Sequence, residues 1–189
     1  MHCSALQFLR LGSVPTRARS ESIAPLPMVL SDELIAVVKR GDLAALEEHM
    51  NGGGDPNERA SDRDVQCTLL SFAALEGQVM AMRRLLAHGA NPHLHNSYEW
   101  TPLHVAAANW QGAAVEVLLE AGAKVDVRAT TGATPLMHAS IRGDVRSIRA
   151  LLKAGATVED AMIKEARTLE HPEAVKLLEG ARASDRMRA

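Results

Sequence analysis

The feature that most constrains the fold of this chain is an internal repeat of 33 residues. Three landmarks keep that spacing: threonines at Thr68, Thr101 and Thr134, glycines at Gly89, Gly122 and Gly155, and leucine pairs that end at Leu86, Leu119 and Leu152. Independent landmarks that share one period indicate a solenoid, in which each unit packs only on its neighbours. The sequence therefore predicts a stack of similar units rather than a single layered core.

Each period carries the signals of two helices and a loop. In the last complete period, Thr134 is suited to cap a first helix, with Pro135 at the first helical position, where its missing N–H is not needed. A second helix is indicated by apolar residues at helical spacing, Val145, Ile148, Leu151 and Leu152. Gly155 follows it, where a left-handed residue ends a helix without a Cβ clash. Aromatic residues make up only 3% of the chain, which favours thin layers of closely packed helices.

The stretch Thr101-Pro102-Leu103-His104-Val105-Ala106-Ala107, with the Gly-Ala that closes each unit, resembles the ankyrin repeat. The resemblance covers roughly residues 31–180. It implies an all-α solenoid of stacked helix–turn–helix units with hairpin fingers. It also implies that fingers and concave helix faces grip proteins, and that His104 makes structural hydrogen bonds between turns.

The ends of the array are predicted to be atypical, because their outer faces have no neighbour. Units are expected at residues 31–62, 63–95, 96–128 and 129–157, a cap without a finger at 158–183, and a frayed tail at 184–189. Gly53 and Gly89 are 36 residues apart, so the first finger carries three extra residues, around Arg59 to Val65.

Residues 1–30 precede the array and are predicted to be a disordered leader or a targeting segment. Arg10, Arg17 and Arg19, among serines, resemble a mitochondrial presequence. A start of translation at Met28 would instead place the segment outside the protein. The alternatives stay open at this stage.

Charge and cysteine content bear on partners and compartment. The net charge of −2 gives no basic field for nucleic acid or an anionic membrane. No apolar run approaches the roughly 20 residues that span a bilayer. Cys3 and Cys67 are far apart in sequence and are not expected to form a disulfide, so a cytoplasmic monomer is predicted.

The third unit holds both tryptophans and the only tyrosine of the chain, at Tyr98, Trp100 and Trp110. Trp110 stands where other units have glycine (Gly41, Gly77 and Gly143). A left-handed conformation there would strain a tryptophan by about 1 kcal/mol or more, and Gly112 is placed to let the turn shift. Tryptophan and tyrosine are enriched in binding hot spots. Two interpretations stay open: a partner-binding anchor, or packing of Trp100 over the neighbouring finger and of Trp110 over the turn.

Polar residues on the same expected face would form a mixed-charge rim, which suits a protein rather than a polyanion. They complete the predicted partner-binding set: Asp64, Glu76, His95, Asn109, Arg128 and Arg142.

Metal binding and catalysis have little support in the sequence. His88, His93 and His95 lie near one finger, but no CxxC, HExxH or carboxylate pair accompanies them, so no metal or cofactor is expected. The histidines at His49, His138 and His171 have no companions in the sequence. No nucleophile elbow or phosphate loop occurs, Cys67 is expected to be an exposed thiol, and no catalytic residue is predicted.

The leading hypothesis is a non-catalytic protein–protein interaction module that binds through hairpin fingers and the concave helix face. An inhibitor or immunity-type protein that neutralises one cognate toxin or effector is a narrower alternative. Two alternatives belong to other classes: a metal-binding or enzymatic protein that uses the region from His88 to His95, and a self-assembling scaffold.

Overall fold

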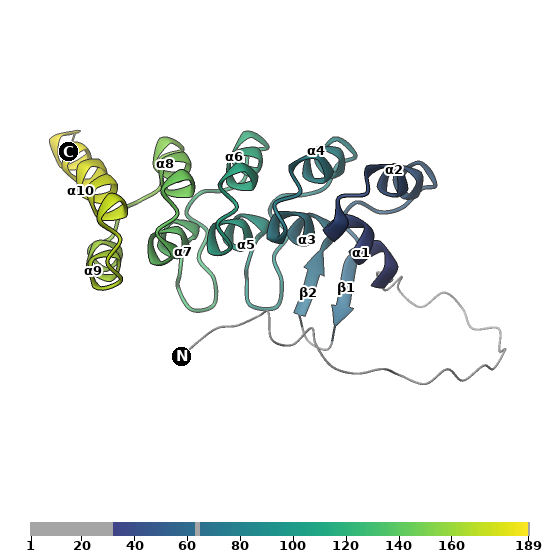
Figure 1. Cartoon of the computed structure of the whole chain (residues 1–189), viewed down its shortest axis with the longest axis horizontal. Helices are drawn as coiled ribbons and strands as arrows, with labels where there is room; N and C mark the ends of the chain where they lie inside the picture. The colour runs from purple at the N-terminus through teal and green to yellow at the C-terminus, as the bar shows by residue number, and fades with distance from the viewer. Residues whose placement is uncertain (1–31, 63–64, 189) are drawn as a thin grey trace.

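The computed structural model describes residues 32–62 and 65–188 (Figure 1). The predicted leader and Asp64 of the predicted binding set lie outside the described residues. Ten helices in the described part alternate between two rows. The inner row consists of α1 (Asp32–Arg40), α3 (Leu69–Leu75), α5 (Pro102–Ala108), α7 (Pro135–Arg142) and α9 (Asp160–Thr168). The outer row consists of α2 (Leu43–Asn51), α4 (Val79–Ala87), α6 (Gly112–Glu120), α8 (Val145–Lys153) and α10 (Pro172–Arg188).

Successive helix pairs form five stacked units, and the predicted all-α ankyrin-type solenoid is confirmed. Each inner helix packs on the inner helix of the next unit, and the outer helices stack in the same way. The connections between units extend away from the helices as fingers on the side of the inner row (Figure 1). Residues 154–159 pass from α8 to α9 without such a finger.

Small and aliphatic side chains fill the space between the two rows. The inner helices approach closely because alanines such as Ala73, Ala106 and Ala139 are fully buried between them. The outer helices contribute the first leucine of each pair, Leu85 or Leu118 in the second and third units. A core of this kind is close-packed without large aromatic rings.

The turn signals of the sequence are present in the structure. The side chains of Thr68 and Thr134 accept hydrogen bonds from backbone N–H groups three residues further on, which caps α3 and α7. The glycines that follow the outer helices have φ values of 91°, 81° and 88°, at Gly89, Gly122 and Gly155. A residue with a Cβ is disfavoured at such φ values.

The first finger differs from the other two. The region with three extra residues forms a two-stranded antiparallel hairpin of β1 (Arg59–Asp62) and β2 (Val65–Thr68), with Arg59 opposite Thr68. The insertion was predicted, but its strands were not.

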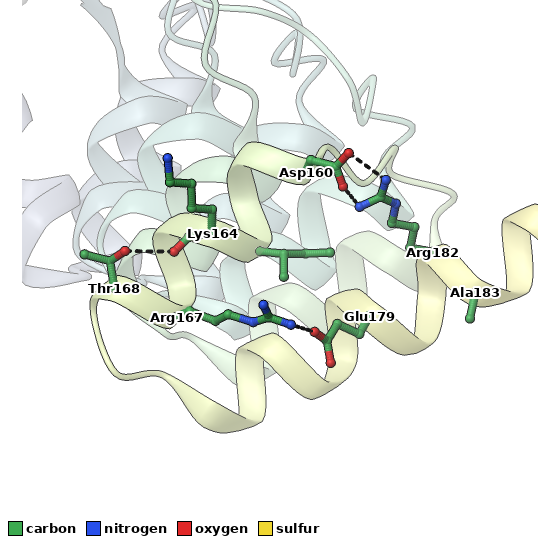
Figure 2. A pocket seen from close by; sticks show the side chains of 8 residues that line it. Asp160, Lys164, Arg167, Thr168, Glu179, Arg182 and Ala183 are labelled. Atoms are coloured by element: carbon green, nitrogen blue, oxygen red, sulfur yellow. Dashed lines mark hydrogen bonds and ion pairs between the residues drawn. The ribbon is translucent and has the colours of Figure 1, made fainter.

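The last unit closes the stack with a polar face. Helix α10 has 17 residues and continues to Arg188, through the segment that was expected to fray. Ion pairs between Arg167 and Glu179 and between Arg182 and Asp160 join α9 to α10 (Figure 2). These side chains line a polar pocket on the outer face of the last unit. A polar outer face is what the terminal unit of a repeat array requires.

Candidate partner-binding surface

The turn between inner and outer helix contains one left-handed residue in every unit. In four units φ at this residue is 69° (Gly41), 66° (Gly77), 57° (Trp110) and 69° (Gly143). Trp110 therefore adopts the backbone conformation of the glycines, which is costly for a bulky residue. The predicted strain is present, and the expected shift of the turn at Gly112 does not occur.

At three of these turns a side chain of the next unit lies over the glycine, so an added Cβ would displace that side chain. A Cβ added to Gly41 would lie 2.5 Å from Gln78, and one added to Gly77 would lie 2.1 Å from Gln111. A Cβ at Gly143 would lie 2.6 Å from the ring of a histidine in the last unit. A side chain here would therefore disturb the contact between units as well as strain the turn.

The same overlying side chains join neighbouring units by hydrogen bonds. The amides of Gln78 and Gln111 donate to backbone carbonyls one unit back, over N···O distances of 2.8 and 3.3 Å. His171 Nε2 donates in the same way to the carbonyl of Ile141, at 3.0 Å. The partner of His171 is a backbone group of another unit, which has no local signal in the sequence.

The junction between the third and fourth units is built differently. The fourth unit has Asp144 at the position of the glutamines, and its carboxylate caps its own helix by accepting from the N–H groups of Arg146 and Ser147. The side chain of Asp144 is therefore engaged with its own helix and does not reach back over residue 110 as the glutamines do, which leaves room for a Cβ there. Trp110 Nε1 instead donates forward to the carbonyl of Arg142, at 3.0 Å. The hydrogen bond between these units therefore runs in the opposite direction.

Trp110 combines this junction role with high exposure. Its side chain is 59% exposed, and the Arg142 guanidinium lies 4.8 Å from the ring centroid. The hydrogen bond to Arg142 fits the interpretation that Trp110 packs over the turn. The interpretation that Trp110 anchors a partner protein stays a prediction.

Trp100 packs on the fourth unit. Its half-buried ring lies 4.5 Å from the ring of His138 and 6.2 Å from that of His104, centroid to centroid. This contact joins two units and has no local signal in the sequence. Burial lowers the pKa of His138 to about 4, helped by His104 and Arg142. Its Nε2 is buried without a hydrogen-bond partner.

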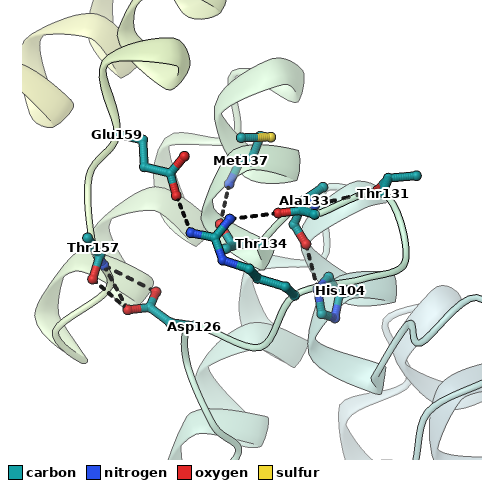
Figure 3. A network of polar contacts seen from close by, with 10 residues as sticks. His104, Asp126, Thr131, Ala133, Thr134, Met137, Thr157 and Glu159 are labelled. Carbon is teal, nitrogen blue, oxygen red and sulfur yellow. Dashed lines mark hydrogen bonds and ion pairs between the residues drawn. The ribbon is translucent and has the colours of Figure 1, made fainter.

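His104 has the structural role that the resemblance implied. Its Nδ1 accepts from the backbone N–H of Thr101 at 3.2 Å, and its Nε2–H donates to the carbonyl of Ala133 at 3.2 Å (Figure 3). This arrangement fixes the neutral tautomer, and burial lowers the pKa of the ring. His104 thereby links the start of its own inner helix to the third finger.

Arg128 also stabilises the third finger. Its guanidinium donates to the carbonyl of Gly132 at 2.9 Å and pairs with Glu159 at 2.6 Å. Nearby, Asp126 accepts from the hydroxyl and N–H of Thr157 (Figure 3). The finger is therefore tied to the residues that precede α9.

The remaining predicted residues lie on the fingers and at the ends of inner helices. Tyr98 is 54% exposed on the second finger, and its carbonyl accepts from the N–H of Thr130 at 3.1 Å. His95 is exposed on the same finger. Glu76 and Asn109 each precede a left-handed turn residue, as Arg142 does, so these three occupy equivalent positions in successive units.

Three residues of this surface were missed in the sequence: Lys39, Arg40 and Phe72. Lys39 Nζ lies 5.3 Å from the ring centroid of Phe72. Arg40 is exposed and precedes Gly41 as Glu76 precedes Gly77. The repeat pattern would have found Arg40 once the three extra residues of the first finger are allowed for, because Gly41 and Gly77 are 36 residues apart. The contact between Lys39 and Phe72 joins two units and has no local signal.

His88, His49 and Cys67 lie away from Trp100 and Trp110 in sequence and have neighbours of their own. His88 Nε2 lies 3.1 Å from Glu47, and His49 Nε2 lies 3.5 Å from the buried carboxylate of Glu58. Within residues 32–62 and 65–188, no three histidine, cysteine or acidic side chains gather as metal ligands. Cys67 is half-buried rather than exposed as expected, and burial raises the pKa of its thiol. None of the described helices is long and apolar enough to cross a membrane.

Comparison with known proteins defines the class. The model of ankyrin repeats (3 copies) matches residues 34–129 and again residues 70–162. The chain belongs to the ankyrin-repeat family, whose repeats are generally protein–protein interaction modules and whose members are typically not enzymes. The ankyrin repeat protein FPV222 of Fowlpox virus (strain NVSL) is 30% identical over 73 residues, which are 39% of this chain and 9% of that protein.

Proposed function

We propose that this chain is a non-catalytic module that binds a partner protein through its fingers and inner helices. The observation that carries the proposal is the exposure of Tyr98 and Trp110, at 54% and 59%, in a chain with few aromatic residues. They flank α5, which is about 10 Å long at 1.5 Å per residue. Exposed tyrosine and tryptophan side chains are typical centres of protein interfaces.

The side chain of Trp110 and the backbone at Tyr98 are held in place before any partner arrives. The indole of Trp110 is oriented by its hydrogen bond to the fourth unit and by the guanidinium of Arg142. The backbone of Tyr98 is joined to the third finger. Ordered aromatic anchors lose little conformational entropy on binding, which favours affinity.

A photo-crosslinking amino acid in place of Tyr98 tests the proposal. In extract of the native cell, illumination is expected to join the module to a partner protein. Met80 on outer helix α4 is the matched control, because it is equally exposed at 54% but lies on the opposite row. Equal adducts from both positions, or none from position 98, would contradict the proposal.

An inhibitor of one cognate toxin or effector would use this same surface. The activity of the captured partner, measured with and without excess module, separates inhibition from an adaptor role. The polar outer face of the last unit supports a monomer, and light scattering of the purified chain tests that part of the proposal.

A further inference from the structure

We infer that the partner presents an extended segment with carboxylates at both ends and an apolar residue between them. The inference rests on the proposed function and specifies the chemistry of the partner. It starts from an inner charge row, defined as the residue before the left-handed turn residue in the first four units. The row consists of Arg40, Glu76, Asn109 and Arg142.

The cations at both ends of this row lack acidic partners within the described chain. Lys39, which adjoins Arg40, lies over the ring of Phe72, and Arg142 lies over the ring of Trp110. None of the described carboxylates forms an ion pair with Lys39, Arg40 or Arg142. A cation that rests on an aromatic ring keeps N–H donors free for a carboxylate.

Several outer-helix arginines behave differently. Arg83 pairs with Glu120 at 3.0 Å, Arg84 with Glu47 at 3.2 Å, and Arg146 with Glu116 at 2.6 Å. Each pair joins neighbouring outer helices. These outer charges are neutralised within the chain, whereas the charges at the ends of the inner row are open to a partner.

The spacing of the units sets the length of the segment. Neighbouring helices pack roughly 8–10 Å apart, so the first and fourth inner helices are about 25–30 Å apart. An extended chain rises about 3.3 Å per residue, so roughly eight or nine residues separate the two acidic ends. Trp110 and its neighbour Asn109 lie between the ends, where the apolar residue of the segment would meet the indole.

The middle of the row favours a protein over a nucleic acid. Glu76 interrupts the positive charges, and the net charge of the chain is −2. A nucleic acid carries a phosphate at every nucleotide and would place one against Glu76. A protein segment leaves that position free of negative charge.

Selection from a phage-displayed library of random peptides, about 16 residues long to exceed the estimated span, tests the inference on the whole chain. Enriched peptides are expected to carry acidic residues at the estimated separation. The best of them is then measured by fluorescence anisotropy against Arg142→Glu and Lys39→Glu. Each reversal is expected to weaken binding about tenfold or more, and added salt is expected to weaken it as well.

Arg149→Glu is the matched control, because Arg149 is exposed on the outer helix of the same unit and its reversal changes the net charge equally. It is expected to change affinity less than about twofold. Equal effects of Arg142→Glu and Arg149→Glu would overturn the inference. So would an enriched set without paired acids, no enrichment, or tight binding of a single-stranded oligonucleotide that depends on Arg142. None of these outcomes contradicts the proposed function, which the crosslinking experiment at position 98 tests separately.

Discussion

The junction between the third and fourth units and the junction between the second and third units solve one packing problem in two ways. Between the second and third units, Gln111 reaches back over Gly77 and donates to the carbonyl of Leu75. Between the third and fourth units, Asp144 caps its own helix, and Trp110 instead donates forward to the carbonyl of Arg142. The backbone is the same in both, with φ values of 66° and 57°. A large exposed aromatic therefore fits this turn only where no glutamine of the next unit reaches back over it.

The largest effect is expected from a side chain at the covered turn. Gly77→Ala would strain the left-handed residue and displace Gln111, which costs about 2–3 kcal/mol as the sum of strain and a lost hydrogen bond. Urea denaturation measures it. Gly53→Ala is the matched control, since φ is 89° there but nothing lies within 4 Å of an added Cβ. A loss equal to that of Gly53→Ala would show that the overlying glutamine is irrelevant.

The second largest loss of stability is expected from removal of the Trp100 ring, which joins the second finger to the fourth unit. Trp100→Ala would remove the ring that packs on His138 and His104 and is expected to cost about 2 kcal/mol, less than the loss of a fully buried ring would. Tyr98→Ala, on the same finger but exposed, is expected to change the free energy of unfolding by under about 0.5 kcal/mol. Similar losses in the two variants would contradict the packing that the structure shows.

The fold could be predicted because its landmarks are local requirements. A capping threonine, a left-handed glycine and a leucine stripe each act within one or two helical turns, so their period reveals the stack. The contact of Trp100 with His138 and the cover over Gly77 depend on which face of one unit meets the next. The strain at Trp110 was predicted from its own position, but the reason that a side chain fits there lies at Asp144, in the next unit. The shared position of Glu76, Asn109 and Arg142 follows from the register, whereas the cation pairing with aromatic rings required the structure.

Acid is expected to weaken the junction between the third and fourth units. The pKa of His138 is about 4 in the folded chain, against an ordinary value of 6.5. The unfolded chain therefore binds more protons between these values, and stability present above pH 6.5 is lost as the pH falls towards 4. The loss should be about 1–2 kcal/mol after allowance for partial exposure.

His138→Phe isolates this contribution, because Phe72 occupies the equivalent position in the second unit. Urea denaturation at pH 7.5 and at about pH 4.5, a point within the window, should show a smaller difference between the two conditions for the variant than for the parent chain. Identical pH profiles would assign the acid sensitivity to other groups, such as His104, whose pKa is also lowered by burial.

A double-mutant cycle at the reversed junction gives the smallest and most specific effect. Asp144→Gln alone removes a helix cap and should cost about 1 kcal/mol, because the Cβ of Trp110 blocks the new glutamine. Combined with Trp110→Gly, that glutamine is free to reach over residue 110 and donate to the carbonyl of Ala108, the equivalent of Leu75. The double variant should then be about 1 kcal/mol more stable than the sum of the two single effects predicts.

A second cycle with Trp110→Ala in place of Trp110→Gly is the control. The Cβ remains in that variant, so the coupling energy should vanish. Additive behaviour in both cycles would mean that cover by the next unit does not decide which residue this turn accepts, and the exposed tryptophan would then need another cause.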